Sequence, residues 1–340
     1  MRLNRFALFA LFVTLNFAPI QAQSRAQNWH VATTFHPGGE GGWDYVTVDA
    51  PHHRLFVTRA SHTQAIDTRT GKLLADIPGQ VRAHGVALVP KLNRGFITDG
   101  GGSGAILVFD LTTYKVLGRI QTMPDSDGII YDPGTDLVLA VSGDGNSLMT
   151  FHPNIDPVNG KVTTIALGGA PEFLAADGSG KAYVNLENKD LVAVVDLHTN
   201  MVLARWPVAP GGHPVGMAID PPDHRIFIGC RKPQKMIVMN TETGKIEAAL
   251  PIGMGNDAAG FDHGHAFASC GDGTLTVIGK KDGNFEVEQT VKTALGARTM
   301  GLDRTTRQIF LPTAEMLPGA PGQRPHPKPG TFEMVVVSGN

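Results

Sequence analysis

The sequence predicts an all-β fold: a seven-bladed β-propeller built of four-stranded antiparallel blades. A sequence unit repeats seven times at a spacing of 40 to 45 residues, which is typical of propeller blades. The apolar segments within each unit are short, rich in Val, Ile, Phe and Thr, and bounded by Gly, Pro or Asp, as β-strands are. Amphipathic helical stretches are almost absent, so helical repeats of similar length fit the sequence poorly.

The composition agrees with a folded domain and excludes several classes of protein. The 340 residues are 42% hydrophobic and carry a formal net charge of -2, which excludes a disordered chain. Two cysteines are too few for a disulfide scaffold. Because the chain lacks a net basic field and is only 7% aromatic, nucleic acid is not an expected partner.

The N-terminal segment predicts export. Arg2 and Arg5 precede an apolar stretch over residues 6–17, and Ile20 to Ala22 offer a plausible cleavage site. We expect a signal peptide over residues 1–22 and a single propeller domain over residues 23–340, located in the periplasm or secreted; an uncleaved anchor is the alternative. No later segment approaches the roughly 20 apolar residues that a membrane span needs, so no span is expected after cleavage.

Two markers define the repeat. The first ends the first strand of each unit and falls at Asp49, Val89, Asp132, Asp177, Asp220, Asp262 and Asp303. The second ends the third strand and falls at Asp67, Asp110, His152, Asp196 and Asn240. Thr-Gly-Lys turns then lead to a fourth strand at Gly71 and Gly244, where glycine permits the positive φ of a tight hairpin. Units three and six depart from this pattern, with a His-Pro pair at 152–153 and Lys-Lys-Asp-Gly at 280–283, which predicts irregular outer edges there.

The last unit lacks a strand at the C-terminal end. Strands are expected over residues 298–303, 308–311 and 331–337, after which the chain ends. Residues 29–35 precede the first unit and alternate in polarity as a strand does. We expect this N-terminal segment to pair with residues 331–337 as the outer strand of the last blade, closing the ring and removing its free sheet edges.

Four strings resemble a known family: Gly42 to Tyr45, Gly169 to Phe173, Cys270 to Val277 and Gly296 to Met300. The sequence resembles YncE-like, YVTN-repeat β-propellers over nearly all of the mature chain. The resemblance implies an exported, seven-bladed protein, similar in structure to WD-repeat propellers and to the heavy chain of quinoprotein amine dehydrogenase. Most members have no assigned activity, so the resemblance supports the fold and leaves the chemistry open.

The residues just ahead of each innermost strand should meet around the channel at one face of the ring. About five positions before the first marker lie Asp44, His84, Asp127, Glu172, Val215, Asp257 and Thr299. Trp43 and Arg298 lie beside the first and last of these. We therefore predict a ligand-binding channel mouth, with Trp43 as an apolar wall, formed by Trp43, Asp44, His84, Asp127, Glu172, Asp257 and Arg298.

These residue types allow several kinds of chemistry. Converging carboxylates and an imidazole can bind a divalent cation or act as an acid and a base, or they can simply cap backbone groups and hold channel water. The sequence assigns no metal and leaves the cofactor open. We expect a binding or interaction module for a small molecule or a protein partner at the mouth. The alternative is a periplasmic lyase, hydrolase or quinoprotein-like oxidoreductase, with His84 as base, Asp127 or Glu172 as acid, and Arg298 holding an anion.

Two further features leave alternatives open. The Pro-rich insertion at residues 318–329 in the last blade either covers the mouth or forms a mobile surface loop, and Glu315 ahead of it adds a possible carboxylate to the same face. Cys230 and Cys270 occupy matching positions in adjacent units, as either a disulfide or two buried thiols.

Overall fold

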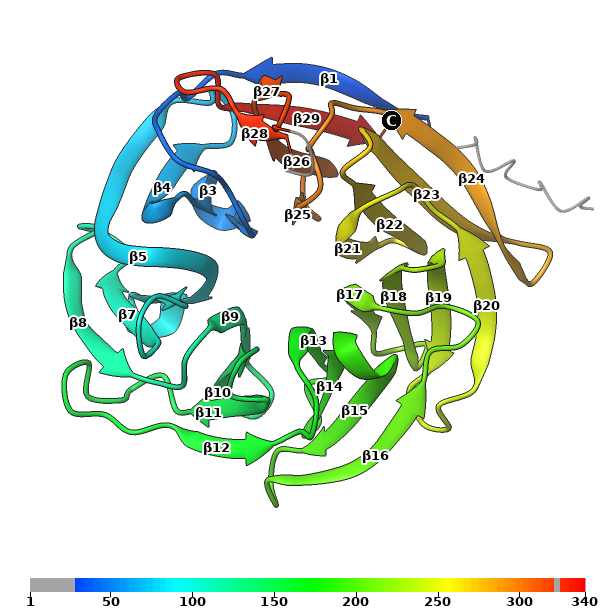
Figure 1. Cartoon of the computed structure of the whole chain (residues 1–340), viewed down its shortest axis with the longest axis horizontal. Coiled ribbons are helices and arrows are strands. Elements are labelled where there is room, and N and C mark those ends of the chain that lie inside the picture. Colours follow the sequence, from blue (N-terminus) through cyan, green and yellow to red (C-terminus); the bar gives the residue numbers. More distant parts are fainter. Residues whose placement is uncertain (1–27, 321–324, 340) are drawn as a thin grey trace, which may run out of the picture.

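The computed structural model describes residues 28–320 and 325–339, so the expected signal peptide at 1–22 lies outside the described residues. The described residues form 29 strands and three short 3-10 helices, and all of the paired strands are antiparallel. The sheets stand side by side around a common centre (Figure 1), with the innermost strand of each nearest that centre. Among these residues no helix is long and apolar enough to cross a membrane.

The strands fall into sheets in chain order. The first sheet contains β2 (Val46–Asp49), β3 (Arg54–Thr58), β4 (Ala60–Asp67), β5 (Leu73–Val89), β6 (Arg94–Asp99), β7 (Ala105–Asp110) and β8 (Val116–Gln121). The next two contain β9 (Ser126–Asp132), β10 (Leu137–Ser142), β11 (Ser147–Phe151) and β12 (Thr163–Ala166), then β13 (Pro171–Ala176), β14 (Lys181–Leu186), β15 (Leu191–Asp196) and β16 (Met201–Pro207). The 3-10 helices are η1 (Ala50–His52), η2 (Pro90–Leu92) and η3 (Glu187–Lys189).

Three four-stranded sheets and one two-stranded sheet complete the described chain. Two are formed by β17 (Pro214–Asp220), β18 (Arg225–Arg231), β19 (Gln234–Asn240) and β20 (Ile246–Pro251), and by β21 (Asn256–Asp262), β22 (His265–Cys270), β23 (Thr274–Lys281) and β24 (Asn284–Lys292). The last has the order β1 (Trp29–Phe35), β29 (Glu333–Gly339), β26 (Gln308–Thr313) and β25 (Gly301–Asp303), and β27 (Met316–Leu317) pairs with β28 (His326–Pro327). Segments from the two ends of the chain thus share one sheet, in which β1 pairs antiparallel with β29.

The first sheet has seven strands rather than four. The 17-residue strand β5 pairs with β4 through its first half and with β6 through its second half. β5 is therefore both the outer strand of the group β2 to β5 and the inner strand of the group β5 to β8. Gly79, with a φ of +98°, lies where β5 crosses between the two groups, a backbone conformation that L side chains rarely adopt.

The second sequence marker forms turns at Asp67, Asp110 and Asn240. The Asp67 carboxylate accepts hydrogen bonds from the backbone N–H of Arg69 and Thr70 and from the Thr70 hydroxyl. Asp110 and Asn240 make the same set of bonds in their own turns. A short side chain that binds the backbone two and three residues ahead fixes the chain reversal, which explains why Asp or Asn recurs there.

Irregular edges were expected in units three and six, and only unit three has one. After β11 the chain runs through eleven residues outside any strand before the four-residue β12. In unit six the prediction is wrong, because β23 and the nine-residue β24 are joined by a tight turn. Asp282 and Gly283 both have positive φ there, as a two-residue hairpin turn requires.

The hydrophobic core lies between the faces of neighbouring sheets. Large buried side chains in these layers come from β3, β6, β10, β14, β18, β22 and β26: Phe56, Phe96, Leu139, Tyr183, Phe227, Phe267 and Phe310. Cys230 and Cys270 are free, buried in two different clusters, and burial raises the pKa of each thiol to about 12. The disulfide alternative is therefore wrong.

Candidate functional site

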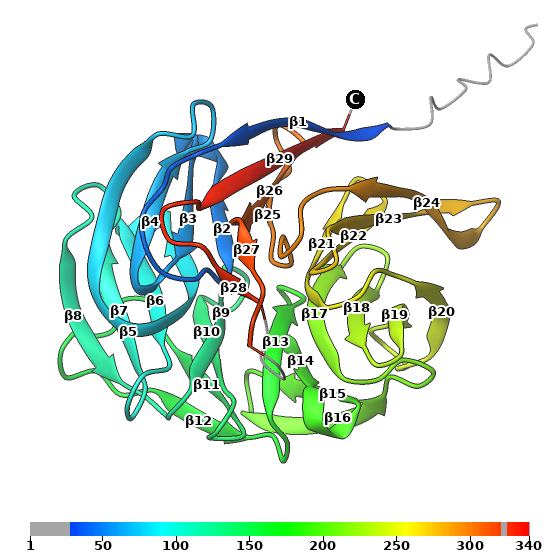
Figure 2. The ribbon, with the colours of Figure 1, turned by 45° about the horizontal axis from the view of Figure 1, so that its top comes forward.

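The inner strands begin around a central cavity of about 800 Å³, a volume typical of small-molecule sites. Most of its lining side chains are ionisable: Asp44, Tyr45, Arg82, His84, Asp125, Asp127, Glu172, Glu187, Arg231, Asp257 and Arg298. Met316 and Pro325, from the segment that includes β27 and β28, also line it. Figure 2 shows this segment descending from the last sheet toward the centre.

Six of the seven residues predicted for the mouth line this cavity: Asp44, His84, Asp127, Glu172, Asp257 and Arg298. Trp43 does not line it, which corrects the expectation of an apolar wall. Its side chain is buried in the cluster that contains Phe332, and the Arg298 guanidinium carbon lies 5.9 Å from its ring centroid. Asp44 faces the cavity, while the Trp43 ring packs behind it.

Five ionisable lining residues were not predicted: Tyr45, Arg82, Asp125, Glu187 and Arg231. Arg82 and Asp125 each lie two residues before a predicted mouth residue. Glu187 directly follows β14, the second strand of its sheet, and Arg231 ends β18, the second strand of the next sheet. Because the second strand runs antiparallel to the first, its end lies at the same face of the ring as the start of the first strand. Aligning the repeats at the end of the second strand, as well as the first, would have found these two.

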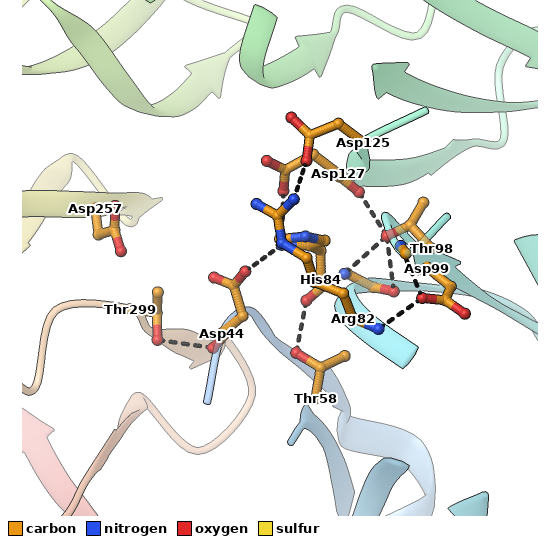
Figure 3. Close-up of polar contacts among 12 residues, drawn as sticks. Asp44, Thr58, Arg82, His84, Thr98, Asp99, Asp125, Asp127, Asp257 and Thr299 are labelled. Atoms are coloured by element: carbon orange, nitrogen blue, oxygen red, sulfur yellow. Dashed lines mark hydrogen bonds and ion pairs between the residues drawn. The ribbon is translucent and has the colours of Figure 1, made fainter. Parts of the chain in front are cut away.

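Three side chains from neighbouring blades meet on one side of the cavity (Figure 3). His84 Nδ1 lies 2.6 Å from Asp44 Oδ2 and 3.4 Å from Asp127 Oδ1. The ligating atoms of all three residues lie within 4.8 Å of one another. In the described part of the chain this is the one group of three or more His, Cys, Asp or Glu side chains that meets such a spacing. We call Asp44, His84 and Asp127 the acidic histidine cluster.

Buried threonines hold the backbone of each cluster residue (Figure 3). The hydroxyls of Thr58, Thr98 and Thr299 donate hydrogen bonds to the backbone carbonyls of His84, Asp127 and Asp44, at 2.6, 2.5 and 2.8 Å. All three threonines are fully buried. Each bond links two neighbouring units of the repeat, so the cluster geometry is fixed by the packing of one blade on the next.

On another side of the cavity, Asp257 binds two guanidinium groups. Arg298 Nε donates to Asp257 Oδ2 at 2.5 Å, and Arg231 Nη2 donates to Asp257 Oδ1. Burial opposes the charge of Arg298, but the Asp257 and Asp44 carboxylates outweigh this and raise its pKa. Because Arg298 is already paired, the role of anion holder assigned to it in the enzyme alternative would compete with Asp257.

Two carboxyls have strongly perturbed acidity. Burial, followed by repulsion from Asp257, raises the pKa of Glu172 to about 8. Burial, followed by repulsion from Asp44 and then Glu172, raises the pKa of Asp127 well above its ordinary value. The folded state thus retains a proton on Glu172 that the unfolded chain loses near pH 4.5. The stability that this group contributes is full below that pH and is lost as the pH rises through about 8.

Glu315 does not join the mouth. Its carboxylate pairs with Lys328 Nζ at 2.8 Å, and it lines a separate cavity beside His36, Gly330 and Phe332. The Pro-rich insertion is described on both sides of residues 321–324, and Pro325 on its far side borders the central cavity.

No protein-family model matches the chain, and no curated protein matches its sequence. Solved structures do match. The Myceliophteria thermophila Cps50 (Swd1) β-propeller domain has a TM-score of 0.70 at 10% identity, over 92% of this chain and 99% of that chain. The chain has the β-propeller fold. A chain of the Mitotic Checkpoint Complex has a TM-score of 0.72 at 10% identity, over 98% of both chains. Kuenenia stuttgartiensis hydrazine synthase has a TM-score of 0.68 at 13% identity, over 81% of this chain and 92% of that chain. At such identities the likeness establishes the fold alone.

Proposed function

We propose that this protein is an exported, seven-bladed β-propeller of the YncE-like type, a single domain closed by β1, whose central cavity binds a small ligand that bears positive charge. The resemblance of the four sequence strings supports the family, and the basic and apolar N-terminal segment supports export. The pairing of β1 with β29 supports closure, because it joins the two ends of the chain in one sheet.

The balance of charge in the cavity supports a cationic ligand. Its lining contains six carboxyl groups, against three guanidiniums and one imidazole. Arg82 pairs with Asp125 at 2.7 Å, and two arginines share Asp257. Within the described residues Glu172 makes no ion pair. The position of Glu172 on the cavity wall, without an ion-pair partner among the described residues, is the observation that carries the proposal, because a bound cation would supply the counter-charge that this carboxyl lacks.

Three probes of equal length test the sign of the ligand charge: putrescine, its uncharged diol analogue and succinate. We expect calorimetric titration at low ionic strength to detect putrescine binding only. Replacing Glu172 with glutamine should weaken that binding about tenfold, since it removes one charge pair worth about 1.4 kcal/mol. Glu242→Gln, at an exposed turn far from the cavity, is the matched control and should bind as the wild type does. Preferential binding of succinate, or equal binding of putrescine by Glu172→Gln, would contradict the proposal.

An enzymatic role is the second candidate, and one observation favours it. Asp44 orients His84 through a 2.6 Å hydrogen bond, while Glu172 holds a proton near neutral pH, so a base and an acid line the same cavity. This candidate requires that a bound ligand be converted to product. Binding without conversion supports the binding module instead.

A further inference from the structure

One imidazole and two carboxyl groups come together at the acidic histidine cluster, where three inner strands begin. We propose that Asp44, His84 and Asp127 bind one Zn²⁺ ion, with a fourth coordination position open to the central cavity. The inference concerns different atoms from those proposed to bind the organic ligand, and it stands whether or not that ligand binds. Zn²⁺ would balance the two cluster carboxylates and leave Glu172 available to a cationic ligand.

The donor set is the first argument for zinc. Imidazole nitrogen with carboxylate oxygen is a common combination for Zn²⁺, whereas Mg²⁺ and Ca²⁺ favour oxygen ligands alone. Three protein ligands with one open position are typical of zinc sites that take a water or a substrate. Both cysteines are buried away from the cavity in apolar clusters and offer no competing site there.

The spacing of the atoms is the second argument. Zinc–ligand bonds of about 2.1 Å in a tetrahedron place neighbouring ligand atoms about 3.4 Å apart. His84 Nδ1 and Asp127 Oδ1 already have this separation, at 3.4 Å. His84 Nδ1 and Asp44 Oδ2, at 2.6 Å, would need to separate by less than about 1 Å as the ion replaces their hydrogen bond.

An unpartnered buried atom is the third argument. Asp127 Oδ1 is inaccessible to solvent and accepts no hydrogen bond from the described residues, and the His84 side chain beside it is 10% exposed. The hydrogen bond between His84 and Asp44 explains the position of two members of the cluster and leaves this oxygen without a partner. Buried polar atoms are seldom left without a partner, because each such atom destabilises the folded state by about 1–3 kcal/mol. A metal ion at the centre would satisfy it.

The surroundings hold the three residues in place. The hydroxyls of Thr58, Thr98 and Thr299 bind the backbone carbonyls of the three residues from the neighbouring units. Ligands fixed in this way by a buried outer layer need little rearrangement to bind an ion.

Titration of Zn²⁺ into chelator-treated full-length mature protein tests the proposal. We expect one ion per chain, and at least tenfold weaker binding in Asp127→Asn and in His84→Gln. The amide in Asp127→Asn has the shape of the carboxylate and removes a buried charge, so the variant should fold; circular dichroism checks this. Glu242→Gln, at an exposed turn outside the cavity, is the control and should bind Zn²⁺ as the wild type does. Absence of binding, or unchanged affinity in Asp127→Asn, would overturn the proposal.

X-ray absorption at the zinc edge gives a second readout that needs no variant. We expect one imidazole and otherwise oxygen ligands around the ion in the wild-type protein. Sulfur, or two or more imidazoles, would place the ion elsewhere and overturn the assignment. Because the putrescine proposal is tested at Glu172 and the zinc proposal at Asp127 and His84, the two proposals of this cavity fail separately.

Discussion

Replacing Arg59 with methionine should lower the free energy of unfolding by about 3 kcal/mol. The Arg59 side chain is fully buried, and its guanidinium donates hydrogen bonds to the backbone carbonyls of residues 38–42 and to Gln64 Oε1. It also stacks on Phe332, with 3.6 Å between the guanidinium carbon and the ring centroid. Methionine fills much of the same space but leaves these acceptors without their donor. Burial lowers the pKa of Arg59 to about 10, so the group remains charged at neutral pH.

Arg69→Met is the matched control, since Arg69 lies in the same sheet region and is largely exposed. Urea denaturation of both variants should show a large loss for Arg59 and a change within about 0.5 kcal/mol for Arg69. Equal stability of the two variants would mean that the hydrogen bonds from Arg59 to these carbonyls contribute nothing to the free energy of unfolding.

Arg59→Met should also affect the candidate site. The loop that surrounds the guanidinium, residues 38–42, leads directly into Trp43 and Asp44. Gly39 and Gly41 both have a φ of +90°, a conformation that lets their carbonyls turn toward Arg59. The hydrogen bonds between Arg59 and this loop therefore help to place Asp44 at the cavity. Arg59→Met should weaken zinc binding as well as lower the free energy of unfolding.

Trp29→Ala should destabilise the protein by about 3–5 kcal/mol, the usual cost of removing a large buried aromatic side chain. Trp29 is 1% exposed, although it opens the first described strand. Its ring packs edge-on against Phe267 of the neighbouring sheet, with centroids 4.7 Å apart, and its backbone N–H and C=O both bind the Gln289 side chain. Removal of residues 23–36 should lower the melting temperature further, because β29 loses its outer partner.

Val31→Ala offers a control on the same strand, where Val31 is 40% exposed and should tolerate truncation with little loss. Differential scanning calorimetry compares the two substitutions and the deletion. A melting temperature in the deletion variant equal to that of the wild type would exclude a role for β1 in closing the ring.

The fold could be predicted where local chemistry determines it. Asp67, Asp110 and Asn240 recur because each fixes a turn through bonds to the next few residues, so the blade period is visible in the sequence itself. The continuous strand β5 and the regular hairpin at Asp282 could not be predicted, because sheet pairing rather than local pattern decides where a strand ends.

The sequence predicted which positions of the chain lie at the cavity, but it predicted less well which of their side chains are in contact. The repeat locates the entrance of each inner strand, so six mouth residues were found from spacing alone. The sequence does not show that Arg231 and Arg298 share Asp257, since residues 26 and 41 positions from it meet only through the packing of separate strands. Trp43 was misplaced because the repeat gives the position of a residue along the strand and not the side to which its ring turns.

A carbon-13 NMR titration of the Glu172 carboxyl tests the central claim most directly: that the mouth carboxyls converge in the central cavity. Protein labelled at the glutamate side-chain carboxyl carbon, compared with Glu172→Gln to assign the signal, gives the pKa without any ligand. We expect a midpoint at about 8, because burial and the neighbouring Asp257 favour the protonated form. A midpoint near the ordinary 4.5 would show that Glu172 is solvated and apart from the other carboxyls, and would contradict the account.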